Sequence, residues 1–323
     1  MLLWHALLLG LVEGITEFLP ISSTGHLLIT SALLGLDEPR TREAANAFVI
    51  VIQGGAILAV LGLYTARVMQ MLRGVMGRDA AGLRLAINIA IAFLPAAALG
   101  FLFHDWIDRH LFRTGPVLAA LVLGGLWMIW LEYRWKSRGI GRHAADASDP
   151  ATAGMNLDEL DWRRALGIGL FQCIAMWPGT SRSMMTIAGG TTLGLRPRDA
   201  AEFSFLLGLP TLGGACVYRL AKDLLRAQET GEASLFQSLG ATPVIAGMLV
   251  AAIAAAIAIR WLVGFLNRHG LGVFGIYRIL LAGVLFALIQ GGVVNISQSD
   301  ESAPTIEQAA PETPPPQDPN SAR

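Results

Sequence analysis

Charge is scarce in this chain: only 15% of its 323 residues are Asp, Glu, Lys or Arg, against about 25% in soluble domains. Cysteine is scarcer still, and both residues, Cys173 and Cys216, stand in apolar surroundings. Neither a disulfide framework nor a thiolate metal site is therefore expected. A Walker A loop and a Rossmann glycine pattern are also missing, so soluble nucleotide use is unsupported. The first residues lack a basic segment before their apolar run, and we expect no cleaved signal peptide.

The chain is instead rich in long apolar runs. Hydrophobic residues make up 54% of it, and runs close to the length of a bilayer crossing (about 20 residues) recur six times. These runs are Ala47–Tyr64, Leu85–Phe103, Pro116–Leu131, Ala201–Tyr218, Val244–Leu262 and Leu271–Leu288. The sequence thus predicts an all-α polytopic membrane protein with six transmembrane helices.

Two further apolar stretches are too broken to cross a membrane. Glu13, Glu17 and Pro20 interrupt the first, Leu2–Leu34. Pro178, Gly179 and Arg182 interrupt the second, Ala165–Leu195. Non-helical backbone is tolerated at membrane depth only where protein or water satisfies it. Each stretch is predicted to be a re-entrant helix–loop–helix hairpin.

The two broken stretches also resemble each other. GLVEGITEFLPISST (Gly10–Thr24) aligns with GLFQCIAMWPGTSR (Gly169–Arg182) with one gap, which places Glu13 on Gln172 and Ser23 on Ser181. This weak symmetry predicts a structural repeat, with halves at about 1–135 and 163–293. Residues 139–160 are expected to be a flexible polar loop, and the acidic, Pro-rich residues 294–323 a disordered tail.

Arginine is concentrated in two of the connecting segments. The loops after Tyr64 and after Leu131 are rich in Arg and Lys, whereas those at Asp37–Glu43 and His104–Arg113 are balanced. The positive-inside rule places the two basic loops in the cytoplasm. Counting the spans between them, the two hairpins enter from opposite faces, so the repeat is predicted to have inverted topology.

The first hairpin carries two acids at helical spacing, Glu13 and Glu17. They would share a helix face, where like charges repel. They could reach headgroup water, share a proton, or bind a divalent cation, for which their oxygens favour magnesium or calcium. Ser22, Ser23 and Thr24 follow at the expected start of a helix, a place suited to phosphate, although capping would explain one hydroxyl. His26 lies within a turn of Ser23 and is a candidate base.

The second hairpin carries PGTSRS (Pro178–Ser183), with Thr186 one turn on. An arginine inside an apolar segment needs an anion or acid partner. Arg182, flanked by Ser181 and Ser183, therefore suggests a phosphate clamp or an ion pair with Glu13 or Glu17. If both hairpin tips meet at the midplane, their side chains form a phosphoryl-transfer site for a lipid phosphate.

Three motifs resemble one known family: EGITEFLPISSTGH (Glu13–His26), PGTSRSMMT (Pro178–Thr186) and EFSFLL (Glu202–Leu207). They are similar to the undecaprenyl-diphosphate phosphatases of the bacitracin-resistance (BacA/UppP) type, and the resemblance extends to about Gly291. Two features depart from that family: Met184 and Met185 stand where its members usually have small residues, and the acidic tail is an addition.

The resemblance implies an integral enzyme of the bacterial inner membrane, with its site open to the periplasm. Such an enzyme removes the terminal phosphate of undecaprenyl diphosphate, regenerates the carrier lipid for cell-envelope synthesis and gives bacitracin resistance. It requires a divalent cation (Mg²⁺ or Ca²⁺) and has no nucleic-acid partner, and a homo-oligomer is possible.

The resemblance also assigns roles to the matched residues. Glu13 and Glu17 become the acidic, metal-binding pair, Ser23 the nucleophile and His26 its assisting base. Arg182 binds the diphosphate, and Ser22, Thr24, Ser181, Ser183 and Thr186 support it.

Several alternatives stay open at this point. Activated water could attack in place of Ser23. The chain could be a transporter or lipid flippase, since inverted repeats are common in transporters. A scaffold that only sequesters the lipid would tolerate Ser23→Ala.

Overall fold

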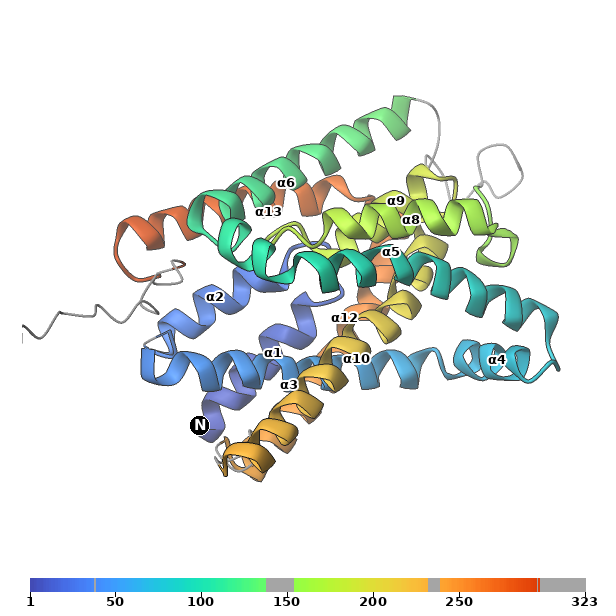
Figure 1. Ribbon diagram of the computed structural model, residues 1–323. Helices are drawn as coiled ribbons and strands as arrows, with labels where there is room; N and C mark the ends of the chain where they lie inside the picture. The colour runs from blue at the N-terminus through green and yellow to red at the C-terminus, as the bar shows by residue number, and fades with distance from the viewer. Residues whose placement is uncertain (38, 138–153, 232–238, 295, 297–323) are drawn as a thin grey trace, which may run out of the picture.

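The long helices of the fold match the six predicted spans. A computed structural model describes residues 1–37, 39–137, 154–231, 239–294 and 296, and these are helical apart from turns, short loops and one isolated bridge, between Met155 and Leu195 (Figure 1). Within these residues, six helices are long and apolar enough to cross a membrane, which confirms the predicted six spans. They are α3 (Pro39–Leu63), α5 (Ala80–Leu111), α6 (Thr114–Ser137), α10 (Pro197–Thr230), α12 (Ala241–His269) and α13 (Gly272–Gln290).

Two pairs of short helices form hairpins. The first pair is α1 (Leu3–Thr16) and α2 (Ser23–Leu33), and the second is α8 (Trp162–Ile174) and α9 (Arg182–Thr192). The longest has 14 residues, about 21 Å at 1.5 Å per residue, which is short of the roughly 30 Å of a bilayer core. The hairpins approach from opposite ends of the molecule and their tips meet inside it (Figure 1). An inverted repeat requires this arrangement; the repeat itself and entry into the bilayer stay predictions.

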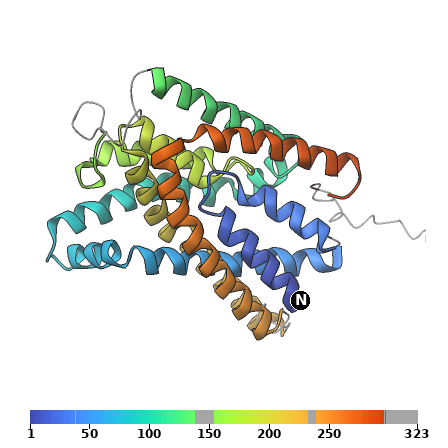
Figure 2. The same ribbon diagram turned by 180° about the vertical axis from the view of Figure 1, so that it is seen from behind.

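The two halves of the chain interlock. Helix α1 packs along α12, and α8 packs along α5, so each hairpin rests on a long helix of the other half. Helices α6 and α13, which end the two halves, lie side by side (Figure 2). The hairpin tips are therefore held by helices from both halves.

The structure corrects the predicted alignment of the two hairpins. Ser22 and Ser181 are the two non-glycine residues with positive φ in the described chain, at 75° and 74°, and each caps the helix that follows. Ser22, not Ser23, is thus the counterpart of Ser181, and no gap is needed. Ser23 then corresponds to Arg182, while Glu13 still corresponds to Gln172. The gapped alignment was wrong because it also placed Pro20 on Pro178, and these two prolines occupy different places in their loops.

Two segments predicted as loops are helical. Residues after Tyr64 form α4 (Thr65–Val75), and α5 continues to Leu111 through most of the expected loop at His104–Arg113. Hydropathy detects helices that contact lipid or core, and charged residues on the surface of a helix do not interrupt its backbone hydrogen bonds. The positions of the spans were therefore predicted correctly, but the helices extend beyond the predicted ends.

The structure describes parts of the predicted flexible loop, 139–160, and of the predicted disordered tail, 294–323. Most of 139–160 and of 294–323 lies outside the described residues, but Met155 hydrogen-bonds through its backbone to Gly194, followed by the 3₁₀ helix η1 (Leu157–Glu159). Leu157 and Leu160 are buried, as are Val294 and Ile296 beyond α13. These apolar residues belong to the hydrophobic core although the segments around them are polar. The average composition of a segment does not identify such single buried residues.

Candidate active site

The first hairpin buries its acids at the end of α1. Glu13 is fully buried and Glu17, at the C-cap, nearly so, which rules out the alternative that both reach headgroup water. After the tip, α2 begins at Ser23, and its cap Ser22 accepts a hydrogen bond from the Gly25 N–H at 3.4 Å. Thr24 is half-buried in the first turn. The sequence therefore places the acids and the hydroxyls on either side of one tight loop.

The second hairpin is built alike and contacts the first. Ser181 caps α9 by accepting from the Met184 N–H at 3.3 Å, and its hydroxyl lies 3.0 Å from that of Ser183. The Ser183 hydroxyl donates to the Leu19 carbonyl of the first tip at 2.9 Å. Thr186 faces α10 instead, with its hydroxyl 2.6 Å from that of Ser204. Of the predicted hydroxyls, that of Ser183 joins the two tips, and that of Thr186 links α9 to α10.

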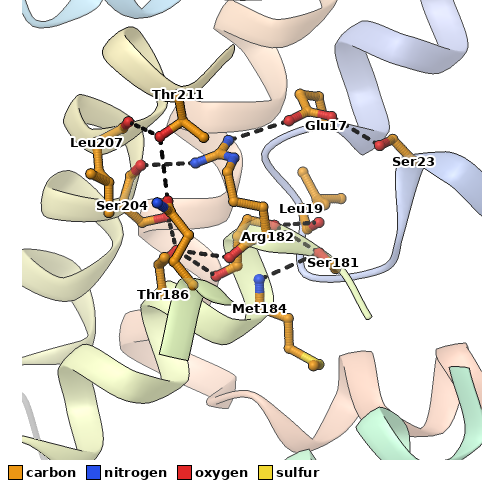
Figure 3. A network of polar contacts seen from close by, with 12 residues as sticks. Glu17, Leu19, Ser23, Ser181, Arg182, Met184, Thr186, Ser204, Leu207 and Thr211 are labelled. Carbon is orange, nitrogen blue, oxygen red and sulfur yellow. Dashed lines mark hydrogen bonds and ion pairs between the residues drawn. The ribbon is translucent and has the colours of Figure 1, made fainter. Parts of the chain in front are cut away.

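Glu17 joins two other predicted residues, Ser23 and Arg182, into one network (Figure 3). Its Oε2 accepts from the Ser23 hydroxyl at 2.9 Å, and its Oε1 pairs with Arg182 Nη2 at 3.3 Å. Arg182 Nη1 donates to the Ser204 carbonyl at 3.0 Å, and its guanidinium lies 5.7 Å from the centre of the Phe18 ring. Its Nε has no hydrogen-bond partner among the described residues. The ion-pair alternative for Arg182 is thus present, and the free Nε still offers a donor to an anion.

Glu13 has buried carboxylate oxygens without a hydrogen-bond partner in the described chain. The side chain of Gln53 on α3 lies near these oxygens but does not form a well-aligned hydrogen bond with them. A buried, unpaired carboxylate is costly unless it is protonated or binds a cation. Glu13 therefore fits a cation ligand. Among the described residues no group of three or more His, Cys, Asp and Glu side chains gathers, so water or substrate oxygens would complete the coordination.

His26 lies elsewhere than its predicted role requires. Its Nδ1 is 2.8 Å from the Ser22 carbonyl and its Nε2 is 2.7 Å from the Tyr277 hydroxyl. Both ring nitrogens are therefore engaged, and the Ser23 hydroxyl donates to Glu17 instead. The structure gives Ser23 a carboxylate as its proton acceptor, where the sequence suggested the imidazole.

Two adjacent residues of α13, Tyr277 and Arg278, were not predicted as site residues. Arg278 is fully buried and its Nη2 donates to the carbonyls of Ala120 and Gly179, at 2.9 and 2.8 Å. Gly179 belongs to the second hairpin tip, so adjacent residues of α13 hold one hairpin each. The sequence could have indicated Arg278, because an arginine within an apolar span needs polar partners. Glu202, the first residue of the EFSFLL motif, pairs with Arg67 at 2.7 Å.

The profile of one protein family, described as bacitracin resistance protein BacA, matches residues 6–284. The chain belongs to this family. Among curated proteins, it is 44% identical to the undecaprenyl-diphosphatase of Sorangium cellulosum (strain So ce56), over 88% of this chain and 86% of the relative. It is 42% identical to undecaprenyl-diphosphatase 2 of Rhodospirillum rubrum, over 92% and 98% of the two chains. A third relative, the undecaprenyl-diphosphatase of Azotobacter vinelandii, is 42% identical over 91% and 96%. The family expected from the three motifs is confirmed.

Proposed function

We propose that the two hairpin tips form the active site of an undecaprenyl-diphosphatase, which hydrolyses undecaprenyl diphosphate to undecaprenyl phosphate and inorganic phosphate. The name carried by the relatives and the family match over most of the chain support this activity. Six apolar helices suit a substrate with a long apolar tail. The product is the lipid carrier for cell-envelope synthesis, and its recycling accounts for the bacitracin resistance in the family's description.

The hydrogen bond from the Ser23 hydroxyl to Glu17 carries the mechanism. Ser23 Oγ attacks the terminal phosphorus as its proton passes to Glu17. The bond from this phosphorus to the bridging oxygen breaks, and undecaprenyl phosphate leaves. Water then attacks the phosphoserine, phosphate is released, and Glu17 returns the proton to Ser23 Oγ. A carboxylate within hydrogen-bond distance of a hydroxyl satisfies the geometric requirement for a general base.

Arg182 stabilises the charge that develops during this transfer. Its guanidinium lies at the N-terminus of α9, beside the turn at the half-buried Ser181, and its Nε has no partner in the described chain. Helix N-termini and guanidinium groups both favour phosphate, and an arginine contact in a water-poor site is strong. In the free protein Glu17 neutralises Arg182; on substrate binding the diphosphate takes over part of that role.

Glu13, together with Glu17, would hold a divalent cation, Mg²⁺ or Ca²⁺. When bound, the cation neutralises diphosphate charge and polarises a phosphoryl oxygen. The buried, unpartnered oxygens of Glu13 support this assignment. The enzyme would act in the bacterial inner membrane with its site open to the periplasm, as the basic loops suggest. Assembly into a homo-oligomer stays a prediction.

The test is phosphate release by detergent-purified protein from undecaprenyl diphosphate labelled at its terminal phosphate. Wild type is compared with Ser23→Ala and with Ser31→Ala, a control two turns further along α2. We expect Ser23→Ala alone to lose turnover, and acid quenching to trap label on wild-type protein. Loss of turnover without a trapped phosphoenzyme would favour attack by water, with Ser23 as a ligand. Undiminished release by Ser23→Ala would reject the nucleophile, and no release by folded wild type would favour a transporter or a lipid-sequestering scaffold.

A further inference from the structure

The hydrogen bonds of His26 define which of its nitrogens carries the proton. A backbone carbonyl only accepts, so Nδ1, 2.8 Å from the Ser22 carbonyl, carries the hydrogen. In the neutral imidazole Nε2 is then an acceptor, and the Tyr277 hydroxyl, 2.7 Å away, donates to it. The two rings are stacked, with centroids 5.6 Å apart and planes 4° from parallel. The Ser22 carbonyl thus selects the Nδ1–H tautomer, and the Tyr277 hydroxyl stabilises it by donating to Nε2.

The carbonyl held by His26 belongs to a strained residue. Ser22 has φ 75° and ψ 96°, a conformation that is strained for a non-glycine residue and persists only when its surroundings hold it. Its side chain makes one long contact, 3.4 Å from the Gly25 nitrogen. The bond from His26 is the shorter of the two and fixes the orientation of the peptide between Ser22 and Ser23. The position of the Ser23 hydroxyl on Glu17 depends on that peptide.

The second hairpin is held in a different way. Its strained residue, Ser181, is followed at the position equivalent to His26 by Met185, which is buried and apolar. There the hydroxyl of Ser183 anchors the tip to the Leu19 carbonyl, and Arg278 binds the Gly179 carbonyl. The contact through an imidazole is therefore particular to the hairpin that carries the proposed nucleophile.

We infer that Tyr277 is a positioning residue for the reaction: its hydroxyl holds His26 as the Nδ1–H tautomer, and His26 in turn holds the Ser22 turn that aims Ser23 at Glu17. The catalytic part of this inference rests on the proposed function, whereas the tautomer does not. Without the hydroxyl, Nε2 loses its donor and the preference for the Nδ1–H tautomer weakens. In the molecules that carry the proton on Nε2, the lone pair of Nδ1 faces the Ser22 carbonyl and repels it.

The test compares Tyr277→Phe with Tyr133→Phe. Tyr277 is 43% exposed and Tyr133, on α6, 74% exposed, so each change removes one hydroxyl without opening a core cavity. Histidine is labelled with ¹⁵N in the detergent-purified full chain, and the imidazole nitrogens are observed at about pH 8.5, where a histidine of ordinary acidity is neutral. The chain has six histidines, and His26→Gln identifies the signal of interest.

We expect wild type and Tyr133→Phe to have the His26 proton on Nδ1, and Tyr277→Phe to shift it partly or wholly to Nε2. In phosphate release from undecaprenyl diphosphate, kcat of Tyr277→Phe should fall about tenfold, the effect of one lost hydrogen bond, with KM unchanged. A role confined to folding would lower the unfolding temperature and leave the tautomer alone.

Two results would overturn the inference. One is a wild-type His26 with its proton on Nε2, or a tautomer unchanged in Tyr277→Phe. The other is a changed tautomer with full kcat, which would remove the link to Ser23. Because the tautomer is read without turnover, a Ser23→Ala variant that stays active would reject the proposed nucleophile and leave the tautomer assignment standing.

Discussion

Glu17 divides its carboxylate between the Ser23 hydroxyl and the Arg182 guanidinium. Glutamine at this position would remove the charge that takes the serine proton and would leave Arg182 without its acid. General-base catalysis is worth about 10²–10⁴-fold, and we expect Glu17→Gln to lose at least that much in phosphate release. Initial rates on undecaprenyl diphosphate measure it, with Glu229→Gln at the exposed end of α10 as the control. A variant as fast as wild type would reject Glu17 as the proton acceptor.

Glu13 leads to a prediction about cation binding that does not depend on turnover. A ligand at 100 times its Kd stabilises the folded state by about 2.7 kcal/mol, so Mg²⁺ or Ca²⁺ should raise the unfolding temperature of wild type and a chelator should reverse the shift. Glu13→Gln, which keeps the shape and loses the charge, should show no shift, whereas Glu229→Gln should behave as wild type does. If the cation stabilises Glu13→Gln equally, the site lies elsewhere.

At the residue scale, the sequence predicted which residues share the site better than it predicted which of them hydrogen-bond to one another. Glu17, Ser23 and Arg182 were expected in one site and meet there, because an acid and an arginine in apolar segments need each other. The expected pairing of His26 with Ser23 was inferred from their closeness in the chain. It failed because a side chain in the first turn of a helix can reach the carbonyl four residues back, and His26 does so at Ser22. Tyr277, far along the chain, left no local signal.

At the element scale, glycines set the distance between α1 and α12. A Cβ at Gly10 would lie 2.4 Å from the Gly247 carbonyl oxygen, and one at Gly14 would lie 2.4 Å from that of Ala251. Small residues allow such close approach of membrane helices. This contact fixes α1, which carries Glu13 and ends at the C-cap residue Glu17.

Gly14→Ala should therefore lower both stability and activity. Overpacking costs about 1–3 kcal/mol, more than alanine gains over glycine in helix propensity, about 1 kcal/mol. The matched control is Gly264→Ala on α12, where an added Cβ meets nothing within 4 Å. Thermal unfolding in detergent and phosphate release measure the two effects. Equal unfolding temperatures for the two variants would contradict tight packing of α1 on α12.

Element types were predictable where burial is strong, and element ends were not. The six spans followed from apolar runs alone. Helix α4 carries polar and basic residues such as Arg67 and Arg73 on an amphipathic helix, and it was taken for a loop because hydropathy does not detect such helices. Hydropathy also missed the ordered segment around η1, because that segment is polar on average. Two of its apolar side chains, Leu157 and Leu160, are nevertheless buried in the core.

At the scale of the whole molecule, the sequence anticipated the meeting of two hairpins from opposite ends. An odd number of spans separates the two hairpins, so the hairpins are predicted to enter from opposite faces. Figure 1 shows their tips together in the interior. The exchange of packing partners between halves, α1 on α12 and α8 on α5, was not foreseen. It depends on complementary small residues in segments distant in the chain, and no single segment reveals it.

The orientation of the molecule in the membrane is the last testable consequence. Arg78 precedes α5 and Arg113 follows it, both exposed, at the two ends of a helix of 32 residues, about 48 Å long at 1.5 Å per residue. Arg78 lies in the basic segment that the positive-inside rule assigns to the cytoplasm, so Arg113 should face the periplasm. Each is replaced by cysteine in a background with Cys173→Ala and Cys216→Ala, and intact cells are treated with a membrane-impermeant maleimide. Arg113→Cys should be labelled in intact cells and Arg78→Cys only after permeabilisation. The reverse pattern would turn the first hairpin, with Glu17 and Ser23, toward entry from the cytoplasm, and a periplasmic site for the lipid diphosphate would have to be abandoned.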